Sequence, residues 1–133
     1  MPQDQSSGAA ANEYGRATAK LIASAIGATM IGNRSNEAQY KGKRIVIKCA
    51  RSATTSVGVT YEMQKNLHEI LAAFETTKDK YEVFSLPVAI FSAKQRPTRS
   101  QGAAAHKVGL VSRKVFIESG VFVSSVSVAA GDA

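Results

Sequence analysis

Hydrophobic and polar positions alternate with a period of two residues between Lys43 and Ala50, and this pattern predicts a β-strand. One face of that strand carries Ile45, Ile47 and Cys49. The opposite face carries Val46 and Lys48, so an otherwise apolar strand bears an ammonium group. Two interpretations stay open: Lys48 extends from a partly exposed strand into water, or it offers a fixed cation to a phosphate in a cleft.

Apolar segments elsewhere in the chain predict further strands and helices. The predicted strands lie at 28–32, 57–61, 81–86, 108–112 and 121–128. Helices are predicted at 12–25, 62–76, 87–91 and 112–120. The longest of these rests on an apolar spacing of i, i+4, i+7, i+8 and i+11, formed by Met63, Leu67, Ile70, Leu71 and Phe74. This order predicts an α/β fold with a mixed central β-sheet flanked by helices.

The ends of the first predicted helix and the domain limits follow from local composition. Asn12 is suited to cap the helix at its start, and Gly27 is placed to end it. Residues 1–9 are small and polar, so we expect a flexible N-terminal arm followed by a single domain at 10–133.

Positive charge is concentrated in two windows of the sequence. The chain has 17 Lys and Arg against 10 Asp and Glu, a net charge of +7. Residues 34–51 and 94–114 hold six basic side chains each, while the rest of the chain has more acids than bases. If folding brings the two windows together, they form one basic surface suited to a phosphate-rich partner.

Several classes of protein are disfavoured by composition. The single cysteine cannot form an internal disulfide and no apolar leader opens the chain, so we expect a cytoplasmic protein without a membrane segment. Cys49 is interpreted as a core residue, and the two histidines lack the spacing of a zinc site. Aromatic residues make up 7% and tryptophan is absent, which favours duplex backbone contact over stacking on single strands.

Over residues 10–90 the order of elements resembles the PD-(D/E)XK, or restriction-endonuclease-like, nuclease superfamily. Its layout is a helix with an acid, a β-meander with an acid and then an acid-x-Lys motif, a long helix and a further strand. Glu13, Glu37 and Lys48 match this layout, whereas Val46 stands at the position of the second acid. Glu62, at the head of the next predicted helix, is the candidate for a migrated carboxylate.

The resemblance implies a restriction-endonuclease-like core that hydrolyses phosphodiester bonds with Mg²⁺ or Mn²⁺. The implied metal ligands are Glu13, Glu37 and Glu62, with Lys48 orienting the attacking water; the implied catalytic residues are Lys48, Glu37 and Glu13.

We expect DNA as the partner, bound through its backbone. The candidate contacts are Arg34, Lys43, Arg44, Arg51, Arg96, Arg99 and Lys107. Two alternatives stay open, a catalytically inactive DNA-binding module of the same fold, which Val46 favours, and a basic domain that meets an acidic protein. RNA in place of DNA and a homodimer are also left open.

Overall fold

The computed structural model describes residues 5–31, 36–97 and 107–128, with side chains from Gly15 onward. Within them the helices are α1 (Gln5–Ile26), α2 (Tyr61–Gln64), α3 (Val88–Lys94) and α4 (Arg113–Ser119). The strands are β1 (Thr29–Met30), β2 (Glu37–Tyr40), β3 (Lys43–Ala50), β4 (Ser56–Thr60), β5 (Glu69–Thr77), β6 (Lys80–Pro87), β7 (Arg96–Pro97), β8 (Val108–Ser112) and β9 (Val121–Ser127). No helix in the described part of the chain is long and apolar enough to cross a membrane.

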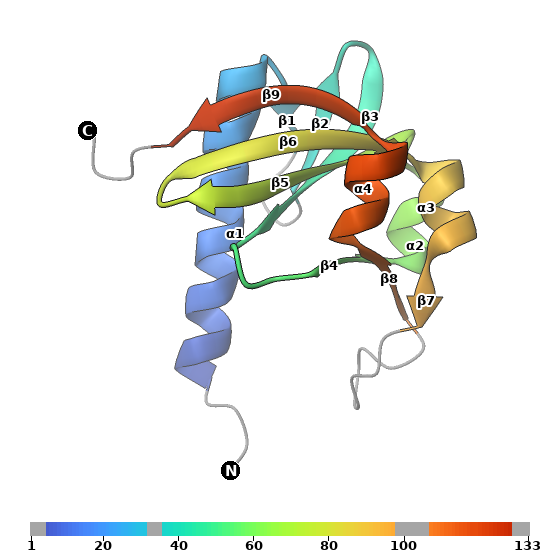
Figure 1. Cartoon of the computed structure of the whole chain (residues 1–133), viewed down its shortest axis with the longest axis horizontal. Coiled ribbons are helices and arrows are strands. Elements are labelled where there is room, and N and C mark those ends of the chain that lie inside the picture. Colours follow the sequence, from blue (N-terminus) through green and yellow to red (C-terminus); the bar gives the residue numbers. More distant parts are fainter. Residues whose placement is uncertain (1–4, 32–35, 98–106, 129–133) are drawn as a thin grey trace.

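A six-stranded sheet in the order β1-β2-β3-β5-β6-β9 forms the centre of the molecule (Figure 1). Its strands pair antiparallel except for β3 and β5, which run parallel. A smaller antiparallel sheet has the order β4-β8-β7. The predicted α/β class, with a mixed central sheet flanked by helices, is therefore confirmed.

The two faces of the central sheet bury two separate cores. On one face, α1 packs Ile22 against Ile45, Ile47 and other apolar residues of the sheet. On the other, Val46 packs in a cluster with residues of the smaller sheet and of α3 and α4. The alternation predicted for β3 is confirmed, because successive residues of the strand enter opposite cores.

The helix predicted over 62–76 is wrong, because the chain forms the short helix α2 and then the strand β5. Residues 70–74 are all buried, since β5 lies between β3 and β6 with a core on each of its faces. A strand covered on both faces has a continuous apolar run. That run contains the helical spacing as a subset, so periodicity alone did not distinguish the two structures.

The first helix begins earlier than its sequence predicted. α1 starts at Gln5 and passes through Asn12, so Asn12 is not its cap. The three alanines at 9–11 are the best helix formers, which fits the added length. The end was predicted correctly, with Gly27 at φ 83° directly after Ile26. The flexibility of residues 1–9 stays a prediction.

The remaining predicted elements are present with small shifts of their ends. α3 runs on to Lys94, three residues past the predicted end of that helix. Two residues of the predicted basic loop, Arg96 and Pro97, form the short strand β7. Residues 98–106 lie outside the described part of the chain.

Gly120 sits where α4 passes into β9, and its N–H donates to the carbonyl oxygen of Phe116 at 3.0 Å. An added Cβ would lie 2.8 Å from the carbonyl oxygen of Ser85, which belongs to a central strand. We expect Gly120→Ala to lower the free energy of unfolding by about 2 kcal/mol, because backbone must move to admit the methyl group. Gly15→Ala in α1 is the control: its Cβ meets nothing within 4 Å, and we expect a gain of about 0.5–1 kcal/mol. Urea unfolding of both variants checks this, and a Gly120→Ala protein as stable as the parent would contradict it.

Candidate nucleic-acid interface

Glu37 and Lys48 lie on the same face of the central sheet. β2 pairs antiparallel with β3, and this register sets Glu37 directly opposite Val46. Opposed residues share a face, and Lys48 follows two positions after Val46 on that face. The pairing therefore brings two of the sequence-predicted catalytic residues to neighbouring positions.

Both Glu37 and Val46 have structural partners of their own. The Glu37 carboxylate accepts from Nε of Arg44 at 2.9 Å and forms an ion pair with Nη2 of Arg44 at 2.9 Å. The side chain of Val46 is 1% exposed and belongs to the core under the smaller sheet. Val46 thus fills a core position where the resembling family would hold a carboxylate.

Lys48 is a half-buried ammonium on this same face, opposite Ala72 of β5. Burial lowers the pKa of Lys48 below its usual range. Among the described residues no carboxylate forms an ion pair with it. Desolvation therefore disfavours the charged form of Lys48, and no described carboxylate offsets this.

The three predicted metal ligands are not assembled by the described residues. Glu62 is exposed on α2 and pairs with Lys65 at 3.1 Å, while Glu37 pairs with Arg44. Glu13 belongs to α1, but its side chain lies outside the described part. Over residues 15–31, 36–97 and 107–128, no three His, Cys, Asp or Glu side chains converge as a metal site would need. The metal set of Glu13, Glu37 and Glu62 stays a prediction.

The two basic windows meet at the loop 51–55, which follows β3. Arg113, at the start of α4, donates from Nη2 to the carbonyl oxygens of Arg51 at 3.1 Å and of Thr54 at 2.7 Å. Arg96 of β7 donates from Nη2 to Oγ of Ser56 at 2.9 Å. Residues forty or more positions apart in the sequence are thereby joined at one end of β3.

Arg113 is the residue of this candidate interface whose structural role the sequence did not reveal. Its backbone N–H also donates to Thr55 at 2.8 Å, and its guanidinium lies 4.8 Å from the centroid of the Phe74 ring. Its Nε is buried and has no hydrogen-bond partner among the described residues. Arg113 therefore holds the shape of the loop and is a positioning residue. Its partners are mainly carbonyl oxygens, which every residue type carries, so no sequence signal identifies them.

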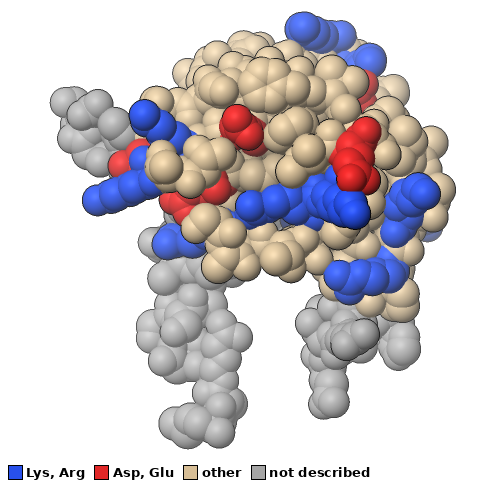
Figure 2. All heavy atoms as spheres, in the orientation of Figure 1, with Lys and Arg blue, Asp and Glu red and all other residues tan. Residues whose placement is uncertain are grey.

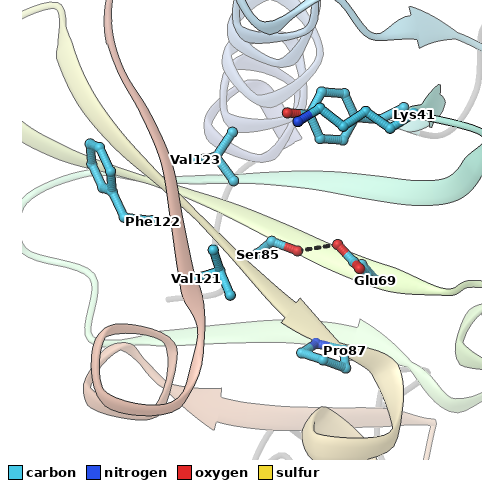
Figure 3. Close-up of a pocket in the computed structure, with 8 residues that line it drawn as sticks. Lys41, Glu69, Ser85, Pro87, Val121, Phe122 and Val123 are labelled. Carbon is cyan, nitrogen blue, oxygen red and sulfur yellow. Dashed lines mark hydrogen bonds between the residues drawn. The ribbon is translucent and has the colours of Figure 1, made fainter.

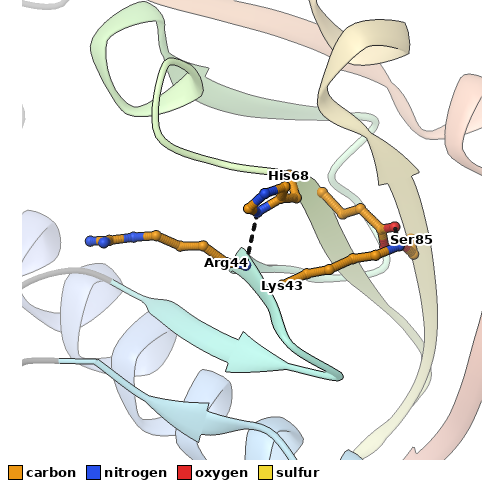
Figure 4. A network of polar contacts seen from close by, with 5 residues as sticks. Lys43, Arg44, His68 and Ser85 are labelled. Atoms are coloured by element: carbon orange, nitrogen blue, oxygen red, sulfur yellow. Dashed lines mark hydrogen bonds and ion pairs between the residues drawn. The ribbon is translucent and has the colours of Figure 1, made fainter.

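The opposite end of β3 carries Lys43 and Arg44, about 25 Å from Arg51 at the rise of a strand. Figure 4 shows both near His68, with the Arg44 N–H donating to Nδ1 of His68 at 3.1 Å. Lys43 forms an ion pair with Glu69 at 2.7 Å, and Arg44 is bound to Glu37. These two predicted DNA contacts thus lie apart from the loop 51–55 and already have acidic partners.

The remaining predicted contacts divide as follows. Lys107 is exposed beside the smaller sheet, and its carbonyl oxygen accepts from the N–H of Tyr61 at 2.9 Å. Arg34 and Arg99 lie outside the described residues. On the face drawn in Figure 2, blue Lys and Arg atoms form separate groups with red acidic atoms among them. On this face the described basic side chains therefore lie in separate groups, and the described contact between the two windows is local to the loop 51–55.

Cys49 is a core residue, as the sequence predicted. It packs against the cluster under α1, and burial raises the pKa of its thiol to about 12. A thiol of that pKa stays protonated at neutral pH and is a poor nucleophile.

A polar network crosses three neighbouring strands near the Lys43 end of the sheet. The carboxylate of Glu69 on β5 accepts from the hydroxyl of Ser85 on β6 and pairs with Lys43 on β3. Ser85 and Glu69 line a cavity of about 250 Å³. Figure 3 shows them together with Val121, Phe122 and Val123, which also line it. Burial raises the pKa of Glu69, but hydrogen bonds from Lys43 and Ser85 outweigh this and the pKa lies below its usual value.

Comparison with known proteins yields matches among solved structures but none among family models or curated proteins. No family model matches the chain, and no curated protein matches it. A Holliday junction resolvase, Hjc of the archaeal hyperthermophile Archaeoglobus fulgidus, superimposes with a TM-score of 0.41 and 11% identity. The match covers 81% of this chain and 93% of the resolvase. This is a distant similarity of the backbone fold alone.

The lowered pKa of Glu69 predicts a pH-dependent contribution to stability. At pH values above 4.5, the usual pKa of the group, the ionised and paired carboxylate stabilises the fold. This contribution is lost as pH falls below that value. We expect Glu69→Gln to lower the free energy of unfolding by about 1 kcal/mol at pH 7, because its ion pair is half exposed. The difference from the parent protein should shrink as pH drops below 4.5.

Urea unfolding at several pH values measures this difference. Glu82→Gln is the matched control, since Glu82 is exposed on the neighbouring strand β6. A stability difference between the parent and Glu69→Gln that does not change with pH would contradict the assignment.

Proposed function

We propose that this domain binds the DNA backbone through the loop 51–55 and the basic side chains around it. The observation that carries the proposal is the clamp by Arg113, which joins the two basic windows by bonds to the carbonyl oxygens of Arg51 and Thr54. Arg51 and Arg96 are exposed there, and each of them belongs to a different one of the two windows.

The local chemistry supports phosphate as the bound group. Exposed hydroxyls on Ser52, Thr54 and Thr55 accompany the arginines, and hydroxyl and guanidinium groups are common donors to phosphate oxygens. Glu75 occupies one donor of the loop, the N–H of Ser52, at 3.2 Å. Because the loop is held in place before binding, little ordering entropy is lost when phosphates bind.

Binding to a fluorescent DNA duplex should weaken steeply as salt rises from about 50 to about 200 mM. Each lost phosphate contact makes the negative slope of log binding constant against log salt concentration shallower by about 0.9. The double variant Arg51→Ala with Arg96→Ala should therefore make the slope shallower by about 2. Lys65→Ala is the matched control, because Lys65 lies outside both windows and pairs with Glu62. An unchanged slope in the double variant, or equal loss in Lys65→Ala, would place the contacts elsewhere and sink the proposal.

A second candidate function is metal-dependent hydrolysis of phosphodiester bonds. It is favoured by the position of Glu37 and Lys48 on one face, which agrees with the resemblance to PD-(D/E)XK nucleases. In that case Glu37, with Glu13 or Glu62, would hold Mg²⁺ or Mn²⁺, and Lys48 would orient water. Val46 opposes it, because the side chain of a buried valine supplies no oxygen to a metal. We therefore propose binding without cleavage as the main function.

Supercoiled plasmid incubated with Mg²⁺ or Mn²⁺ distinguishes the two candidates. If the domain only binds DNA, we expect the parent protein to nick the plasmid no more than the Lys48→Met variant does. Lys48→Met should fold normally, since burial already opposes the charge that it removes. Nicking by the parent protein and by Lys65→Met that disappears in Lys48→Met, with duplex binding retained, would establish the nuclease instead.

A further inference from the structure

β9 is an edge strand of the central sheet. It pairs with β6 along one side, and within the described residues no strand pairs with its other side. Figure 1 shows β9 as the outermost strand there, curving over β6. Within the described residues, the backbone N–H and C=O groups along this outer side therefore have no strand partner.

The sequence of β9 lacks the usual protection of such an edge. Edge strands are commonly guarded by charged side chains or proline, but residues 119–131 contain no ionisable side chain and no proline. Val121 is 66% exposed and Phe122 is 52% exposed. Apolar surface thus accompanies the open backbone.

The pairing of β6 with β9 shows which part of the edge is regular. The register shifts between Val83 and Phe84, which inserts Val123 of β9 as an extra residue. From Ser124 to Ser127 the register is continuous. Ser125 is exposed within this regular part, so a new strand would be centred near it.

We propose that β9 pairs antiparallel with β9 of a second copy of this chain, across a two-fold axis near Ser125. A two-fold contact sets each surface against its own copy, so a chain of net charge +7 repels itself wherever that surface is basic. The β9 edge has no ionisable side chain, so two copies can approach there without like-charge repulsion. Antiparallel pairing satisfies the backbone groups of both edges and makes one sheet from two. This proposal does not depend on the proposed DNA binding.

Sedimentation velocity of the full chain tests the proposal over about 5 to about 500 µM, a range suited to a small interface. We expect a concentration-dependent species of twice 14.1 kDa. Ser125→Lys should weaken dimerisation at least about tenfold, because two ammonium groups then meet at the axis. Ser125→Glu should do the same, and mixing the two variants should restore a dimer of one Lys and one Glu chain.

Ser24→Lys, on an exposed position of α1, is the matched control and should dimerise as the parent does. Circular dichroism melts establish that each variant is folded. A parent chain that stays monomeric at the highest concentration overturns the proposal, as does a dimer that Ser125→Lys leaves intact. Failure of the mixed variants to associate also overturns it, because a merely structural defect would not be repaired by opposite charge.

Discussion

The parallel pairing of β3 with β5 is the constraint on which the rest of the structure depends. Parallel neighbours cannot be joined by a tight turn, so the chain must leave the sheet after Ala50 and return before Glu69. The crossover contains the loop 51–55, β4 and α2, and β4 becomes part of the smaller sheet. That sheet closes the second core over Val46. The candidate interface is therefore built from the connection that the parallel pair requires.

Whether a strand could be predicted from the sequence depended on how much of its length is buried in a core on both faces. β3 has basic residues at its start and Lys48 within it, so its alternation of polar and apolar residues can be recognised in the sequence. The strand was therefore predicted with its observed ends. In β5 the two cores require apolar residues at every position from Ile70 to Phe74, so no alternation survives. The error on that segment followed from tertiary coverage, which a single sequence does not contain.

The sequence predicted which residues the candidate site contains, but not which hydrogen bonds and ion pairs they form. Charge counting identified the windows that contain Arg51, Arg96 and Arg113. Charge counting did not predict that Lys43 pairs with Glu69 and Arg44 with Glu37 at the far end of β3. Those ion pairs depend on strand register. Register is fixed by the whole sheet, whereas charge is a property of each residue alone.

Arg113 holds the loop through carbonyl oxygens, and this choice of acceptor has an evolutionary consequence. Its bonds end on the main chain of Arg51 and Thr54, so the clamp is indifferent to the side chains at those positions. Substitutions along the loop can accumulate while its course is retained. Natural variation can therefore change the side chains that the loop presents, provided that the arginine at 113 is kept.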